Sequence, residues 1–168
     1  YSLGPKVESF ENNFSAYCNS KYTVGVNSGT SALHIALQSL DISTGDEVIV
    51  PAMTFVATPM AVSYTRAKPV FVDTFYPSGL INYNKIEEKI TSRTKAIIPV
   101  HLYGQCANLK EIKKIAKKHK LKIIEDASQA HGSLQNNINI GEVSDAATYS
   151  FYPGKNLGAY GESGCATT

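Results

Sequence analysis

The 168-residue chain has no tryptophan, only three cysteines and two methionines, and almost no excess of either charge. Its 16 Lys and Arg residues against 14 Asp and Glu residues give a formal net charge of +2. A charge so close to zero favours neither a nucleic acid nor an anionic lipid surface as the partner. The sequence also has no run of 18 apolar residues and no charged segment followed by an apolar one. We therefore expect neither a membrane-spanning helix nor a signal peptide.

The cysteines are odd in number, far apart and not in pairs with metal-ligand spacing: Cys18, Cys106 and Cys165. Such a set fits reduced thiols in a cytoplasmic protein better than a disulfide framework. No cluster of acidic residues or histidines with ligand spacing accompanies them, so we expect no metal site.

The composition is that of a globular protein, with 43% hydrophobic and 18% charged residues. A chain of this length fits one domain with a sizeable core, which we place at residues 1–168. The sequence begins with Tyr1 rather than Met and stops at Thr168 inside an expected strand. We therefore expect it to be the N-terminal part of a longer protein.

Segments of helical periodicity alternate with short runs rich in Val and Ile. The patterns predict helices over residues 6–18, 28–40, 55–64, 84–90 and 109–119, and strands over 22–26, 47–50, 69–72, 95–100 and 121–124, with a further short strand near 147–150. This alternation predicts an α/β fold, a three-layer α/β/α domain with a mostly parallel central sheet. Ligands of such sheets bind at the carboxyl ends of the strands, so the residues that follow each strand are the candidates for a site.

Two of these strand ends carry signals that are weak on their own. Residues Ser28-Gly29-Thr30-Ser31 begin a helix directly after the first strand. A helix N-terminus with small hydroxyl residues suits a phosphate, although Ser and Thr are also common helix caps, and alone the pattern favours a cap. Phe55 follows the next strand and is either a core aromatic residue, the default interpretation, or a platform under a planar ring.

The strand over 121–124 ends in two adjacent carboxylates, Glu125 and Asp126. A strand end inside an α/β core desolvates charge, so Asp126 requires a cationic partner, such as a metal ion or a protonated ring nitrogen. His131, a few residues further on, is interpreted as a structural, hydrogen-bonding histidine. The other three histidines show no pattern: His34, His101 and His119.

One lysine, Lys155, lies in a loop that contains Pro153, Gly154, Gly158 and Gly161. A lysine among apolar and small residues can attack a carbonyl group, whereas the alternative is a packed stem with its ammonium in water. Taken alone, the second interpretation is favoured. A phosphate cup, a ring platform, a strand-end acid and a lysine together are the set of groups that pyridoxal phosphate requires.

Several segments, in order along the chain, resemble the DegT/DnrJ/StrS family of nucleotide-sugar aminotransferases, a branch of the fold type I pyridoxal phosphate enzymes. They are Leu3-Gly4-Pro5 with Phe10-Glu11, and residues 28–33, 45–51, 54–58, 100–105, 125–126 with 129–132, and 150–157. The resemblance covers essentially the whole sequence. It implies the large, cofactor-binding domain of the fold type I architecture, with the small C-terminal domain outside these residues.

The resemblance also implies roles for individual residues. Lys155 would carry the cofactor on its amine and then transfer protons, and Asp126 would pair with the pyridine nitrogen. Gln129 would lie near the 3-hydroxyl or the ring face, and Phe55 would stack on the ring. The phosphate ligands would be Thr30, Ser31 and Ser150, with one more ligand from the partner subunit of a homodimer whose active site lies at the interface.

Lys155 also bears on the reaction, because sugar dehydratases that share this fold have histidine in its place. The resemblance therefore implies transamination from an amino acid, usually glutamate, to a keto sugar. Residues 152–162 are most similar to enzymes that aminate C3 of a dTDP-linked 3-keto-6-deoxyhexose. Three alternatives stay open: an aminotransferase for a non-nucleotide keto-cyclitol, a pyridoxal phosphate-binding sensor without turnover, and a nucleotide-binding α/β domain in which Lys155 has no function.

Overall fold

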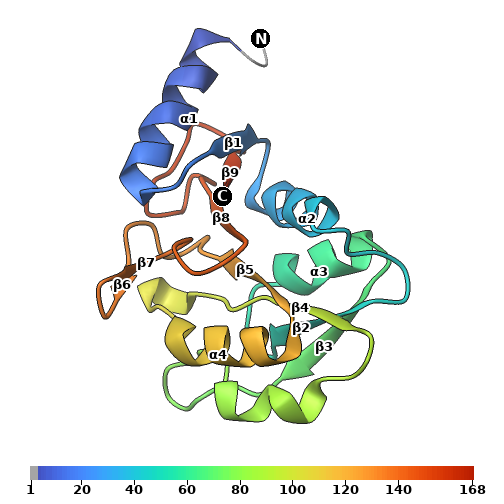
Figure 1. Ribbon diagram of the computed structural model, residues 1–168. Coiled ribbons are helices and arrows are strands. Elements are labelled where there is room, and N and C mark those ends of the chain that lie inside the picture. Colours follow the sequence, from blue (N-terminus) through green and yellow to red (C-terminus); the bar gives the residue numbers. More distant parts are fainter. Residues whose placement is uncertain (1–3) are drawn as a thin grey trace.

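The computed structural model describes residues 4–168, so Leu3 of the N-terminal motif lies outside the described residues. A seven-stranded sheet in the order β1-β9-β8-β5-β4-β2-β3 forms the centre of this part of the molecule (Figure 1). The strands are β1 (Thr23–Val26), β2 (Glu47–Pro51), β3 (Lys68–Val72), β4 (Thr94–Ile97), β5 (Lys122–Asp126), β8 (Ala146–Ser150) and β9 (Gly164–Thr167). The helices are α1 (Pro5–Cys18), α2 (Gly29–Ser39), α3 (Ala57–Tyr64) and α4 (Leu109–His119).

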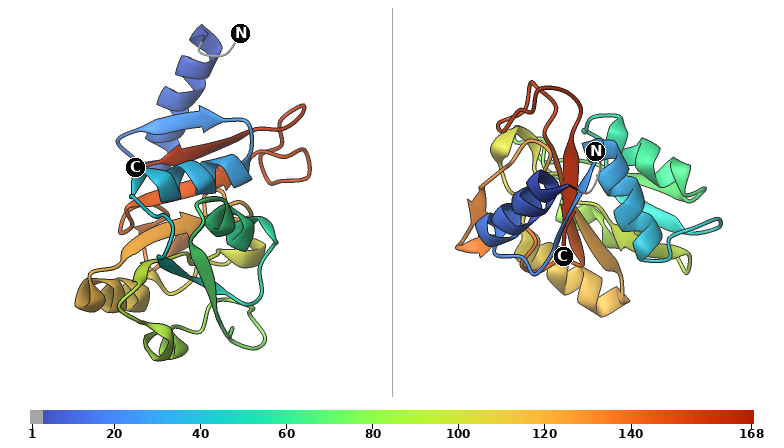
Figure 2. Two further views of the ribbon diagram at one scale, coloured as in Figure 1. Left: turned by 90° about the vertical axis from the view of Figure 1, so that its right-hand side faces the viewer. Right: turned by 90° about the horizontal axis from the view of Figure 1, so that it is seen from above.

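The sheet is mostly parallel, as the sequence predicts. Strands β3, β2, β4, β5 and β8 pair in parallel, and only β9 and β1 at one edge pair antiparallel. The chain therefore returns through β9 between β8 and β1. This return places Gly164, at the start of β9, beside Ser28 at the N-terminus of α2, while the N-terminal end of α1 lies away from the C-terminus (Figure 2).

Helices cover both faces of the sheet, which confirms the three-layer α/β/α prediction. Helices α2 and α3 pack on one face, in a core that includes Val48 and Val50 of β2. The residue between them, Ile49, points to the opposite face and packs with Ile112 of α4. This alternation follows from the two-residue period of a strand, and burial on both faces explains why β2 is apolar almost throughout.

Helix α1 covers the same face as α4 but closer to the antiparallel edge. Phe14 is its only fully buried side chain, and it packs edge-on against Tyr149 of β8 at 5.0 Å and Phe151 at 5.3 Å between ring centroids. This aromatic cluster forms a separate core that holds the strand leading to the lysine loop.

One local prediction differs from the structure, and one small element has no counterpart among the predictions. Residues 84–90 form two short 3-10 turns, Tyr83–Lys85 and Glu87–Lys89, rather than one helix. A small hairpin of β6 (Leu134–Gln135) and β7 (Ile138–Asn139) was not predicted. Its turn places Asn136 and Asn137 at positive φ, a conformation that asparagine tolerates, and its two-residue strands are too short to give a periodic signal. Among the described residues, no helix is long and apolar enough to cross a membrane.

Candidate active site

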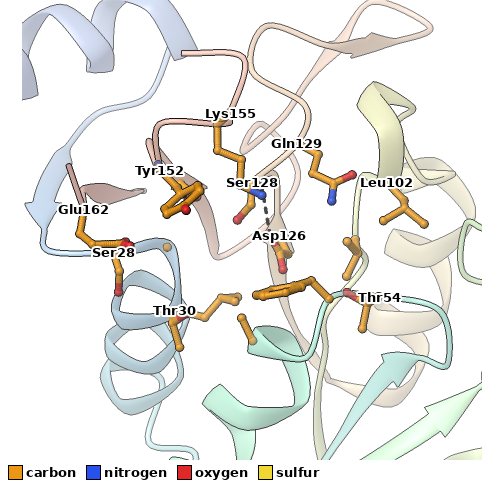
Figure 3. Close-up of a pocket in the computed structure, with 16 residues that line it drawn as sticks. Ser28, Thr30, Thr54, Leu102, Asp126, Ser128, Gln129, Tyr152, Lys155 and Glu162 are labelled. Carbon is orange, nitrogen blue, oxygen red and sulfur yellow. Dashed lines mark hydrogen bonds between the residues drawn. The ribbon is translucent and has the colours of Figure 1, made fainter. Parts of the chain in front are cut away.

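A cavity of about 530 Å³ lies at the carboxyl ends of the parallel strands (Figure 3). Its size is in the range of small-molecule sites. Its lining comes from the N-terminus of α2, the segment before α3, the ends of β4, β5 and β8, and the loop before β9. The lining residues are Ser28, Gly29, Thr30, Leu33, Thr54, Phe55, Ala57, Val100, Leu102, Asp126, Ser128, Gln129, Ser150, Tyr152, Lys155 and Glu162.

One wall of the cavity is the N-terminus of α2. Ser28 caps this helix, because its Oγ accepts a hydrogen bond of 3.1 Å from the backbone N–H of Ser31. The N–H groups of Gly29 and Thr30 donate to no acceptor within residues 4–168. Free N–H groups at the positive end of a helix dipole form an anion site, and the hydroxyls of Thr30 and Ser150 line the same region.

Two glycines allow the helix end to approach the sheet this closely. A Cβ on Gly29 would lie 2.7 Å from Cβ of Ser150 and 3.3 Å from Oγ of Ser128. A Cβ on Gly164 of β9 would lie 2.4 Å from the carbonyl carbon of Ser28. Neither contact is possible for a larger residue without movement of the backbone, so both glycines are required by packing around the anion site.

Asp126 projects into the cavity from the end of β5 and is only 5% exposed. Its Oδ2 accepts a hydrogen bond of 2.8 Å from the hydroxyl of Thr58, and its Oδ1 accepts one of 3.1 Å from the N–H of Ser128. No basic side chain between residues 4 and 168 forms an ion pair with it. The carboxylate is thus oriented by neutral donors, and the cationic partner expected from the sequence stays a prediction.

Phe55 and Gln129 also line the cavity. Phe55 is 67% exposed, so its default interpretation as a core aromatic residue is wrong and the platform role stays available. The Oε1 of Gln129 accepts a hydrogen bond of 2.9 Å from the N–H of Tyr103, which leaves the amide NH2 group free to donate. Figure 3 shows the Gln129 side chain among the residues that line the cavity. Tyr103 presents its N–H from a positive-φ turn, with φ of 57°.

Lys155 is half-buried and lines the cavity from the loop after β8. Its backbone N–H donates to the carbonyl of Tyr152 at 2.8 Å, which closes the turn that carries it. The loop returns at Gly158, where a Cβ would lie 2.5 Å from the carbonyl oxygen of Pro153. No ion pair or hydrogen bond occupies the Lys155 ammonium in the described part of the chain, so the group is available to a ligand.

Six of the seven cofactor-site residues predicted from the sequence line this one cavity: Thr30, Phe55, Asp126, Gln129, Ser150 and Lys155. Ser31 does not line it, and its hydroxyl lies 3.1 Å from that of Ser28, so its role as a phosphate ligand stays a prediction. Ser28, Ser128, Tyr152 and Glu162 were not predicted as site residues, although each lies within or next to a quoted motif. The sequence signal for these four residues is their position in segments that follow the carboxyl ends of predicted strands.

The structure gives roles to two histidines, His101 and His131, and only one of these roles is expected from the sequence. His101, for which no pattern was found, is fully buried with Nε2 2.7 Å from Oε2 of Glu125, which is also fully buried. His131 packs against Tyr149 and Phe151, as a structural residue should, but its ring nitrogens are buried without a hydrogen-bond partner in the described structure. Burial lowers the pKa of His131. No group of three or more metal-ligating side chains occurs within residues 4–168.

A mostly parallel seven-stranded sheet covered by helices on both faces, with a cavity at the carboxyl ends of its strands, has the fold of the type I aminotransferases. The chain belongs to the DegT/DnrJ/EryC1/StrS aminotransferase family, whose sequence profile matches residues 1–168. It is 48% identical over all 168 residues to dTDP-3-amino-3,4,6-trideoxy-alpha-D-glucose transaminase of Streptomyces venezuelae. The matched region is 100% of this chain and 44% of that relative.

Solved structures agree with this assignment. DesV of S. venezuelae, crystallised with a ketimine intermediate, superposes with a TM-score of 0.96 at 48% identity, over 99% of this chain and 45% of that one. NtdA of Bacillus subtilis, with bound cofactor PMP, superposes with a TM-score of 0.93 at 42% identity, over 98% of this chain and 37% of that one. The chain thus spans less than half the length of the relatives it matches.

Proposed function

We propose that the protein to which this chain belongs is a pyridoxal phosphate-dependent transaminase. It moves an amino group from an amino acid, glutamate, to the C3 keto group of a dTDP-linked deoxysugar. The observation that carries the proposal is the convergence of Lys155, Asp126 and the free N-terminus of α2 on one cavity. The sugar and nucleotide follow from the name of the S. venezuelae relative, which is 48% identical throughout this chain.

The cavity fits pyridoxal phosphate at each of the cofactor's functional groups. The unpartnered N–H groups of Gly29 and Thr30 suit the phosphate, and the exposed face of Phe55 suits the ring. The oriented carboxylate of Asp126 suits a protonated ring nitrogen, and the unpaired amine of Lys155 suits the aldehyde. The same four groups in one cavity have no evident use in a nucleotide-binding domain.

When bound, the cofactor would supply a ring that accepts electrons and an aldehyde carbon that carries the amino group from donor to acceptor. Asp126 would hold the proton at the ring nitrogen, and its near-complete burial would keep water from that contact. Lys155 would take up and return the proton at the reacting carbon, since its amine is the only basic side chain that lines the cavity in the described residues. The free amide NH2 of Gln129 would donate to an oxygen on the ring or substrate.

We also propose that the protein acts as a homodimer in the cytoplasm, with part of the phosphate site contributed by the partner. Apolar side chains beside the cavity and on α2 and α3 support a covered surface here. They include Ile35 (44% exposed), Val56 (54%) and Tyr64 (53%). The three cysteines are free thiols, which agrees with a reducing compartment.

Amino transfer by the full-length protein tests the proposal. The protein is loaded with pyridoxal phosphate and mixed with glutamate, and the visible spectrum and the formation of 2-oxoglutarate are followed. We expect stoichiometric conversion of the cofactor, and then amination of a dTDP-3-keto-6-deoxyhexose detected by mass spectrometry. Cofactor binding without conversion would identify the sensor instead, and conversion with amination of a keto-cyclitol alone would identify that alternative substrate.

Replacement of Lys155 provides the matched control for this assay. Lys155→Ala should abolish conversion, because loss of the reacting amine typically costs several kcal/mol of barrier, about tenfold in rate per 1.4 kcal/mol. Lys114→Ala should leave the rate unchanged, because that side chain lies on the exposed face of α4 and pairs with Glu111. An active Lys155→Ala enzyme would contradict the proposed mechanism.

A further inference from the structure

A buried threonine outside the cavity contacts the carboxylate inside it. Thr58, in the first turn of α3, is completely buried and does not line the cavity. Its Oγ1 lies 2.8 Å from Oδ2 of Asp126, a residue 68 positions away in the sequence. A second hydroxyl, Oγ1 of Thr54, lies 2.9 Å from Oγ1 of Thr58 and belongs to a residue that lines the cavity.

The directions of the hydrogen bonds that link Thr54, Thr58 and Asp126 follow from which groups can donate. A carboxylate can only accept, so the hydroxyl of Thr58 donates to Asp126. The one proton of that hydroxyl is then used, and Thr58 must accept the proton of Thr54. Both hydroxyls are therefore ordered toward Asp126, and together with the N–H of Ser128 on Oδ1 they fix both carboxylate oxygens.

The same short segment also positions the ring platform. The backbone N–H of Thr58 donates to the carbonyl of Phe55 at 3.1 Å. Phe55 and Thr54 line the cavity from the loop before α3, while Thr58 reaches Asp126 from within the helix. One helix start therefore sets the relative placement of the carboxylate and the aromatic face.

We propose that Thr58 is a positioning residue that holds Asp126 in the orientation needed to bind the pyridine nitrogen of the cofactor. Thr54 supports Thr58 by donating a hydrogen bond to its hydroxyl. The proposal rests on the proposed function, because it concerns the cofactor that this function requires. Thr58 acts through Asp126 and touches neither cofactor nor substrate. Without the Thr58 hydroxyl, Oδ2 of the buried Asp126 carboxylate loses its only hydrogen-bond donor among the described residues, and only the N–H of Ser128 on Oδ1 still orients the side chain.

The test uses the full-length apoprotein and measures the dissociation constant of pyridoxal phosphate by absorbance titration. Thr58→Val removes the hydroxyl at nearly constant side-chain volume, whereas Thr58→Ser keeps the hydroxyl and removes only the methyl group. Asp126→Asn and the double variant T58V/D126N complete a double-mutant cycle. Thr65→Val is the matched control, because Thr65 follows the same helix, is also buried, and donates its hydroxyl to the carbonyl of Val62 instead of a carboxylate.

We expect Thr58→Val to weaken cofactor binding roughly tenfold or more, the loss typical of a hydrogen bond to a charged group. Thr58→Ser should bind within about threefold of wild type, and Thr65→Val should bind as wild type does. In the Asp126→Asn background, Thr58→Val should cause no further loss. A purely structural role would instead give the same loss in both backgrounds, and that result would overturn the proposal.

Two further results separate this inference from the proposed function. Wild-type protein that does not bind pyridoxal phosphate would overturn both. Wild-type protein that binds while Thr58→Val binds equally well would overturn the inference alone. If the unfolding temperature shows that apo Thr58→Val is not folded, Thr54→Val tests the same chain from the cavity side, with an expected loss of a few-fold that disappears in the Asp126→Asn background.

Discussion

The imidazole of His101 and the carboxylate of Glu125 lie 2.7 Å apart, and neither side chain is exposed. The N–H of Ala107 donates to Nδ1 of His101 at 3.0 Å, so Nε2 carries the proton and donates to Glu125. The N–H of Gly141 donates to the other oxygen of this carboxylate at 2.9 Å. Glu125 and Asp126 are neighbours on β5 and point to opposite faces, which separates a structural carboxylate from one that faces the cavity.

This relationship predicts a large difference between two histidines. His101→Ala removes the imidazole donor from a buried carboxylate and should lower the free energy of unfolding by about 1.5–3 kcal/mol or more. His119→Ala removes a ring that is 29% exposed from its contact with Glu87, and should cost less than about 1 kcal/mol. Urea unfolding of the full-length protein measures both losses. Equal losses for the two variants would show that the buried His101–Glu125 contact stabilises the protein no more than the exposed one does.

A second prediction concerns the close approach of α2 to β8. Gly29→Ala places a Cβ 2.7 Å from Cβ of Ser150, so the helix start must move away from the anion site. We expect weaker binding of pyridoxal phosphate, by roughly tenfold, and a stability loss of about 1–3 kcal/mol. Gly25→Ala is the control, because its Cβ meets nothing closer than 3.4 Å. Unchanged cofactor affinity in Gly29→Ala would remove α2 from the phosphate site.

A third prediction concerns acid sensitivity at the other end of the sheet. Hydrogen bonds from Thr91 at 2.6 Å and Arg93 at 2.7 Å hold the pKa of the buried Glu47 carboxyl below its usual value of 4.5. The unfolded chain therefore binds a proton here at a higher pH than the folded one does. The stability from these contacts is present above pH 4.5 and is lost as the pH falls below that value.

The measurement is urea unfolding of Glu47→Gln and wild type between pH 7 and pH 3. Glu47→Gln should be less stable at pH 7, and the difference should shrink as the pH falls. Glu88→Gln should show neither effect, since Glu88 and its partner Lys85 are both largely exposed. A difference that is constant with pH would contradict the ionic origin of the Glu47 contribution.

The thiols give a fourth prediction. Burial raises the pKa of Cys106 to about 11, and burial also raises the pKa of Cys18 and of Cys165. Thiolates are the reactive form, so at pH 8 the native protein should react with a thiol reagent far more slowly at these positions than the urea-unfolded protein. Peptide mapping after alkylation identifies the sites. Rapid labelling of Cys106 in the native state would contradict its burial.

The sequence predicts the architecture well because the signals are local and repeated. Strands such as Glu47–Pro51 and helices such as Leu109–His119 have clear apolar periodicity, and their alternation implies parallel pairing. The antiparallel edge was not predicted, because the pairing of β9 with β1 joins residues about 140 positions apart. The strand ends were correct to within a few residues, which was enough to bring six of the seven predicted site residues to one cavity.

The contacts that hold those residues in place could not be predicted from the sequence. Nothing around Thr58 distinguishes it from Thr65, yet only Thr58 reaches Asp126. The structural role of His101 likewise depends on its hydrogen bond to Glu125, which lies 24 positions away on strand β5. The contacts of Thr58 and His101 depend on where distant segments of the chain pack in the folded domain. The periodicity of a single sequence does not show which polar side chains will meet in this way.

Lys155 is the residue that we propose holds pyridoxal phosphate, because its amine lines the cavity and has no partner among the described residues. The most direct test is borohydride reduction of the full-length protein after incubation with pyridoxal phosphate, followed by peptide mapping by mass spectrometry. We expect a yellow protein whose visible band is lost on reduction, with the mass of the reduced cofactor on the peptide that contains Lys155. A colourless protein, or a label spread over the exposed lysines of α4 with Lys155 unmodified, would contradict the claim.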